Sequence, residues 1–279
     1  MNMEEKLLRH RREMIRLEMG DPVGGGIGAT RFGGAPDVPA GFVWPTFETA
    51  TYGDDEVKAR PLAFLAQFNC AQLAPLDREG LLPKTGLLAF FYELDSQRWG
   101  FDPADAGCAR VRWFEDLSGL KRAEFPAGLG EDFRLPALGI RLSGEISLPE
   151  RGDFSRLYSG ETDWDSLEEA RAALGADLLD NCSKLLGWPD IIQSNMTQEC
   201  ELVSRGYYLG STWEQIPQKD VEEAAAAVTD WRLLFQLDTV EHEGFELMFG
   251  DCGRLYFYIR EADLKARRFD RVWLILQCG

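Results

Sequence analysis

Two stretches of the chain carry the same order of apolar and polar positions. Residues 65–69 (LAQFN) are echoed by 234–238 (LFQLD), and 86–91 (GLLAFF) are echoed by 253–258 (GRLYFY). Each stretch is short and apolar enough to form a strand. We therefore predict two matched strand pairs, in half-repeats of roughly 30–150 and 180–279, related by an approximate two-fold axis.

The remaining pattern adds further strands and three helices. In 61–69, alternation places Phe64, Ala66 and Phe68 on one face and the residues between them on the other. Apolar runs predict additional strands at 109–114, 139–142, 145–148 and 271–277. Short strands with segregated helices favour an α+β fold, a single compact domain over 1–279 with a mixed, mainly antiparallel sheet.

The helices are predicted from apolar spacing and capping residues. An N-terminal helix over 3–19 opens with Asn2 and Glu5 in a capping box. A second helix begins at Asp165 and runs to 174, and its apolar stripe continues over 178–186. A third begins at Asp220 and extends through 228. The basic runs 9–12 and 265–268 are expected on solvated helix faces.

The charge balance excludes some partners and favours others. The chain has 30 Lys and Arg against 47 Asp and Glu, a formal net charge of -17. Binding to nucleic-acid phosphates or to anionic lipid depends on Lys and Arg, so neither is expected. An acidic surface can instead attract a basic protein partner. The six scattered cysteines, the absence of a signal-peptide pattern and the lack of a long apolar run predict a soluble, cytoplasmic protein.

Familiar catalytic patterns are not found. The two histidines, His10 and His242, have no nucleophile or metal ligand at a recognisable spacing, so we expect no cofactor and no metal. The Gly-rich segment 24–28 has no preceding strand and no following Lys-Ser or Lys-Thr, which argues against a phosphate loop. The lack of a recognisable catalytic pattern favours a protein that is not an enzyme, and the sequence leaves both alternatives open.

A polar pocket between the half-repeats is the main candidate site. If the two halves pack symmetrically, their matched amide and carboxyl side chains could meet near the axis, with two further carboxylates and a tryptophan at the edge. The candidate ligand-binding residues are Gln67, Asn69, Trp99, Asp102, Gln236, Asp238 and Asp251. The alternative is a buried amide network that only satisfies strand ends and turns.

Five blocks along the chain share their order and spacing with one family. They are RFGGAPDVPAGFVWP (31–45), PLAFLAQFN (61–69), GLLAFFYE with WGFDP (86–103), KLLGWPDIIQ (184–193) and MFGDCGRLYFYIR with FDRVWLILQC (248–278). In these blocks the chain resembles the YwqG-like family of uncharacterised bacterial proteins. The resemblance implies a single α+β domain and a bacterial source but no activity. The resemblance also implies that some relatives are encoded near polymorphic toxin genes, which would suggest an immunity or interaction role.

Three hypotheses follow from these observations. The first is a protein-interaction module, immunity-like in role, whose acidic surface binds a basic partner. The second is a small-molecule- or metal-binding protein, or an enzyme, that uses the pocket between the half-repeats. The third is a scaffold whose function lies in the variable region 115–160. Composition and the lack of a catalytic pattern favour the first.

Overall fold

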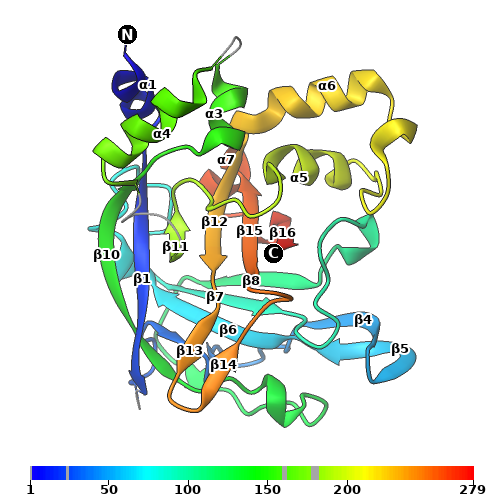
Figure 1. Ribbon diagram of the computed structural model, residues 1–279. Coiled ribbons are helices and arrows are strands. Elements are labelled where there is room, and N and C mark those ends of the chain that lie inside the picture. The colour runs from blue at the N-terminus through cyan, green and yellow to red at the C-terminus, as the bar shows by residue number, and fades with distance from the viewer. Residues whose placement is uncertain (1, 23–24, 159–161, 177–181) are drawn as a thin grey trace.

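The computed structural model describes residues 2–22, 25–158, 162–176 and 182–279 (Figure 1). Ten strands form one sheet, and every strand pairing within the described residues is antiparallel. In spatial order they are β16 (Trp273–Gln277), β15 (Arg254–Arg260), β12 (Trp231–Leu237), β11 (Ser183–Leu186), β1 (Arg12–Pro22), β10 (Leu138–Ser147), β2 (Arg31–Phe32), β6 (Ala63–Asn69), β7 (Leu87–Tyr92) and β8 (Ala109–Phe114). The fold is therefore α+β.

The strand order confirms the internal duplication. Read from either edge, β16 corresponds to β8, β15 to β7, β12 to β6, β11 to β2 and β1 to β10. The registers agree as well: Gln67 pairs with Arg31 on β2, and Gln236 pairs with Lys184 on β11. The pseudo-two-fold axis consequently passes between β1 and β10. The first strand of the chain belongs to the half built from the last strands.

The N-terminal helix is much shorter than the sequence pattern predicts. Helix α1 spans Met3–Arg9, with the predicted capping box of Asn2 and Glu5, and β1 begins at Arg12. The prediction of a helix over 3–19 is therefore wrong after Arg9. Arg, Glu, Met and Leu favour helices in isolation, but pairing with β10 and β11 on both sides of β1 supplies hydrogen bonds that override this propensity.

The sheet curves so that the inner faces of its two halves pack together. Figure 1 shows β6 and β7 running across the direction of β12 and β15. The ring of Phe90 on β7 lies 4.7 Å from that of Phe235 on β12 and 5.4 Å from that of Phe257 on β15, between centroids. These aromatic contacts join both halves in one continuous core.

The same β-bulge interrupts both matched strand pairs. The register shifts between Phe64 and Ala66 in one pair and between Leu233 and Phe235 in the other. At each bulge two successive residues face the shared core, so Leu65 packs with Ala66 while Phe64 packs on the outer face. The strict alternation predicted for 61–69 is therefore wrong at this point.

The two outer faces are covered differently. Phe42 and Trp44 lie over β6 and β7, and the Trp44 Nε1 donates a hydrogen bond to the Leu62 carbonyl at 2.8 Å. On the other half, α5 (Met196–Ser204) packs over β12, β15 and β16, and α6 (Gln218–Ala226) packs against α5. A separate cluster around Leu7 unites α1 with α3 (Arg151–Leu157) and α4 (Trp164–Ala173).

Several predicted boundaries change. Asp163, not Asp165, caps α4, and α6 starts after Pro217 rather than at Asp220. The predicted helix over 178–186 falls partly outside the described residues, and its last part is strand β11. The two short strands expected at 139–142 and 145–148 are one strand, β10.

Smaller elements complete the chain. They are the hairpins β4 (Thr46–Thr51) with β5 (Asp54–Pro61) and β13 (Val240–His242) with β14 (Phe245–Leu247), the pair β3 (Asp37–Val38) with β9 (Lys121–Arg122), and the helices α2 (Cys70–Leu73) and α7 (Glu261–Lys265). In the described part of the chain, no helix has the length and apolarity needed to span a membrane.

Candidate functional site

The two matched glutamines are fully buried, and each lies in a separate network. Gln67 Nε2 donates to Asp37 Oδ2 at 2.7 Å and to the Ala29 carbonyl at 2.8 Å, and Gln67 Oε1 accepts from the Asp37 N–H at 2.9 Å. Arg31 pairs with the same carboxylate at 2.9 Å. Burial would raise the pKa of Asp37, but hydrogen bonds from Arg122, Gln67 and the Gly28 backbone hold it below its usual value.

The second network repeats the first. Gln236 Nε2 donates to Asp190 Oδ2 at 2.6 Å and to the Cys182 carbonyl at 2.7 Å, and Gln236 Oε1 accepts from the Asp190 N–H at 2.9 Å. Lys184 forms the buried ion pair with Asp190. The sequence signal is a repeat in which a cation precedes Gly-x-Pro-Asp, RFGGAPD at 31–37 and KLLGWPD at 184–190. Sequence reasoning missed this repeat.

The predicted convergence of these side chains at the pseudo-axis is wrong. Phe68 and Phe235 face the shared core, so strand alternation sends the neighbouring Gln67 and Gln236 to the outer faces. Each glutamine then fixes a loop of its own half. The geometry is that of the alternative interpretation, a network that satisfies buried polar groups.

Most of the remaining predicted site residues have local contacts. Asn69 caps α2 by accepting from the Ala71 N–H, and Asp238 pairs with Arg254 at 2.9 Å. Asp251 is exposed in a turn before β15. Only Trp99 and Asp102 come together, in a pocket that contains none of the other predicted residues.

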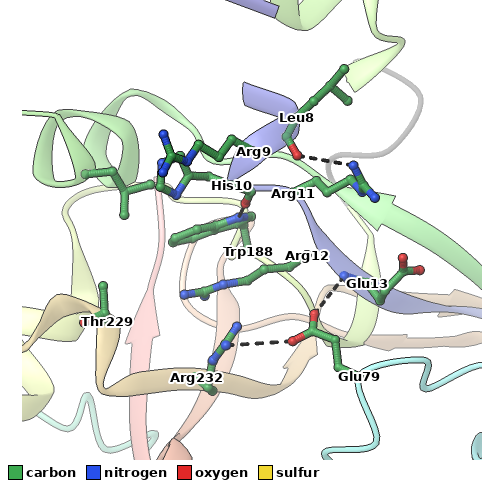
Figure 2. A pocket seen from close by; sticks show the side chains of 11 residues that line it. Leu8, Arg9, His10, Arg11, Arg12, Glu13, Glu79, Trp188, Thr229 and Arg232 are labelled. Carbon is green, nitrogen blue, oxygen red and sulfur yellow. Dashed lines mark hydrogen bonds and ion pairs between the residues drawn. The ribbon is translucent and has the colours of Figure 1, made fainter. Parts of the chain in front are cut away.

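A different cavity, of about 550 Å³, has the more unusual lining (Figure 2). It lies where the junction of α1 and β1 meets β12 and the turn after β11. Its wall carries four arginines and two glutamates, in a chain whose net charge is -17. The lining residues are Leu8, Arg9, His10, Arg11, Arg12, Glu13, Glu79, Leu157, Trp188, Thr229 and Arg232.

Arg12 is held flat against Trp188. Its guanidinium carbon lies 3.4 Å from the centroid of the indole ring, and Figure 2 shows the two side chains stacked. The Trp188 Nε1 donates to the His10 carbonyl at 2.7 Å, which fixes the ring plane. The N–H groups of a stacked guanidinium point outward in the guanidinium's own plane, parallel to the aromatic ring, where a ligand can accept from them.

The N–H groups of Arg12 have no hydrogen-bond or ion-pair partner among the residues that the structure describes. Arg232, by contrast, pairs with Glu261 at 2.6 Å and with Glu79 at 3.8 Å. Burial, followed by the charge of Arg232, lowers the pKa of Arg12 to about 10. Arg12 is therefore still a cation at neutral pH, and its charge is opposed by another cation at the cavity wall.

A buried carboxyl group lies near this arginine. Asp153 is on α3, the helix that also supplies Leu157 to the cavity. Burial raises its pKa to about 6, although the charge of Arg12 and a hydrogen bond from Asn195 act in the opposite direction. His10 has a pKa below its usual value because of burial and of the charges of Arg9 and Arg12.

The arrangement suits electrostatic recognition of an anion. Within the described residues, no group of three or more His, Cys, Asp or Glu side chains is placed to hold a metal ion.

The prediction that residues 9–12 form a solvated helix face is wrong for Arg12, which lies on β1 and is half-buried. The sequence shows two separate signals, the run of arginines over 9–12 and the Trp188-Pro189 turn, but only the fold brings them together.

Residues 30–278 match the family described as "Domain of unknown function (DUF1963)". The chain belongs to this DUF1963 family. No curated protein matches the sequence. Within the cavity, Glu79, Trp188 and Arg232 lie in the DUF1963 region, whereas His10 and Arg12 come from the segment that precedes it. The cavity is therefore assembled from the DUF1963 region and its N-terminal extension.

Proposed function

We propose that this protein binds a small organic anion in the cavity of Figure 2, and that Arg12 is the main partner of the carboxylate or phosphate group. The observation that carries the proposal is the Arg12 guanidinium, stacked on Trp188 with its N–H groups unpaired in the described structure. A planar guanidinium in this state presents two parallel donors that match two anionic oxygens.

The electrostatics of the cavity wall support an anionic ligand. Burial and the neighbouring Arg232 both disfavour the charged form of Arg12. An anion placed between the two guanidinium groups would offset this cost, and the Arg12 pKa would return toward its usual value. The volume of about 550 Å³ lies within the range of small-molecule sites.

The first test is a thermal-shift panel at constant ionic strength. Inorganic phosphate, sulfate, citrate and nucleoside monophosphates are added to the wild-type protein, with chloride as the reference anion. A ligand that binds the folded state alone raises the melting temperature in proportion to the logarithm of its concentration above Kd. We expect at least one multivalent anion to stabilise the wild-type protein and to have little effect on Arg12→Gln.

The matched control is Arg141→Gln. Arg141 is also on the central strand pair, but its side chain is 80% exposed and, among the described residues, pairs with Glu18 alone. This variant should keep the full response to the anion. An equal shift in the wild type and in Arg12→Gln would contradict the proposal, because it would place the anion elsewhere.

We propose a reducing compartment such as the bacterial cytoplasm, because all six cysteines are free and five of them are buried. The name YwqG-like rests on the shared sequence blocks alone.

A further inference from the structure

A second pocket, of about 300 Å³, gathers exposed aromatic side chains. Tyr52 comes from the turn between β4 and β5, Trp99 from the connection between β7 and β8, and Tyr208 from the loop after α5. Their exposed fractions are 86%, 38% and 55%. They are three of the seven large apolar side chains that are exposed in the described part of the chain, and all three line this one pocket.

The backbone that presents Trp99 is fixed on both sides. The Trp99 carbonyl accepts a hydrogen bond from the Leu276 N–H of edge strand β16 at 3.0 Å. Gly100 has a φ of +81°, and a Cβ there would lie 1.8 Å from the Leu274 carbonyl oxygen, so only glycine fits. Gln97 also has a positive φ, of 47°, and its Oε1 accepts from the Gly250 N–H at 3.0 Å. The backbone that presents Trp99 is thus preformed, and Gln97 beside it has a strained conformation.

The polar part of the pocket favours a positive group. Asp102 and Asp105 both line it. Asp102 uses one carboxylate oxygen to cap the Ala104 N–H at 2.8 Å, and the other has no partner among the described residues. The one cation in the lining, Arg98, donates to Thr49 and lies 4.0 Å from Asp105.

We propose that the pocket formed by Tyr52, Trp99, Tyr208 and Asp102 binds an organic cation, an ammonium or guanidinium group. Aromatic faces attract such groups through the ring quadrupole, and several rings around one pocket form a cage for them. The carboxylate of Asp102 adds direct charge complementarity, and the chain's net charge of -17 draws cations toward it. The cation comes either from a basic residue of a protein partner or from a free amine.

Trp99 itself provides the readout. In a ¹⁵N-labelled protein, the indole N–H signal of Trp99 is identified by its loss in Trp99→Phe. The probes are choline, its neutral isostere 3,3-dimethylbutanol, and the capped amides N-acetyl-lysine amide and N-acetyl-arginine amide. We expect a saturable shift of the Trp99 signal with choline or a capped amide, and at least a five-fold weaker response to the neutral isostere.

The two sources of the cation give different results in the same titration. Tighter binding of a capped amide than of choline indicates a basic residue of a protein, and the reverse order indicates a free amine. Either result supports the proposal. Equal shifts with choline and dimethylbutanol, or no saturable shift with any cation, would overturn it.

Variants separate the pocket from general surface effects. Tyr208→Ala and Asp102→Asn should each weaken binding at least three-fold while the other indole signals keep their positions, which shows that the fold is intact. Trp164→Ala is the matched control, because Trp164 is 37% exposed on α4 and belongs to a different surface. Equal affinity in Asp102→Asn and the wild type would show that charge plays no part and would also overturn the proposal.

Discussion

At the scale of single residues, burial changes what a charged side chain can do. Arg12 is part of a run of basic residues that the sequence alone assigns to a solvated face. On β1 it lies against Trp188 and beside Arg232, and this position makes it the candidate ligand partner. The distinction depends on contacts between segments nearly 180 positions apart, which no local pattern contains.

Glu199 on α5 is a buried carboxyl group with a measurable consequence. Its Oε1 accepts from Ser194 at 2.7 Å, and its Oε2 has no partner among the described residues. Burial raises the pKa of Glu199 to about 7, although Ser194 and Arg156 act in the opposite direction. The folded protein therefore binds this proton more tightly than the unfolded chain does, and its free energy of unfolding falls as the pH rises between about 4.5 and 7.

We predict that Glu199→Gln removes this pH dependence. Relative to the wild type, the variant should gain up to roughly 3 kcal/mol between pH 5 and pH 8, since one pKa unit corresponds to about 1.4 kcal/mol. Urea unfolding at both pH values measures the difference. Glu222→Gln, at an exposed position on α6, should follow the wild type at both. If the free energy of unfolding changed equally with pH in Glu199→Gln and in the wild type, ionisation of Glu199 would not destabilise the folded state, and the prediction would be wrong.

At the scale of elements, the two halves share a loop of the same construction, after β2 in one half and after β11 in the other. In each copy a cation on the strand pairs directly with an aspartate six residues later, and a glutamine of the neighbouring strand donates to the same carboxylate. The turn between them contains glycine at a positive φ, Gly34 in one copy and Gly187 in the other. These buried polar residues fix two loops to the sheet.

We predict that Asp190→Ala and Asp37→Ala destabilise the protein by similar amounts. Each would leave a buried cation without its partner, at a cost of about 3–5 kcal/mol. Chemical denaturation measures the loss. Asp270→Ala, which removes a 66% exposed partner of Arg271, should change the free energy of unfolding by about 0.5 kcal/mol or less. Loss of less than about 1 kcal/mol in both buried variants would mean that the loops are held by other contacts.

The sequence predicted those elements whose signal is local. The matched strand pairs and β8 were visible as apolar patterns, and the capping box of α1 was visible as Asn2 three residues before Glu5. The pattern over 12–19 was equally compatible with a helix, and only pairing with β10 and β11 decides it. The outward direction of Gln67 could not be predicted either, because it depends on which face the curved sheet encloses.

At the scale of the whole molecule, the central strand comes from the end of the chain that the family match does not cover. Residues 30–278 include nine of the ten strands of the sheet, and β1 lies between β11 and β10 near the axis. Without β1 the sheet would be divided, and two inner strands would become edges. The same segment supplies Arg12 and His10 to the cavity, so stability and the proposed site share it.

We predict that a fragment of residues 30–278 does not unfold cooperatively, whereas the full chain does. Thermal unfolding followed by circular dichroism distinguishes the two. A synthetic peptide of residues 1–22, added to the fragment, should restore a cooperative transition, and a peptide with Ile15→Asp should not, because Ile15 is fully buried. A fragment that melts cooperatively near the temperature of the full chain would contradict the central role of β1.

The measurement that tests the account most directly is a calorimetric titration of the most stabilising anion of the panel into the wild type and Arg12→Gln. The account predicts one site per chain and a loss of affinity of about 10- to 150-fold in the variant, the value of one or two charge-assisted hydrogen bonds of about 1.5–3 kcal/mol. Arg141→Gln should bind as the wild type does. Unchanged affinity in Arg12→Gln, or no saturable binding of any anion to the wild type, would contradict the anion site.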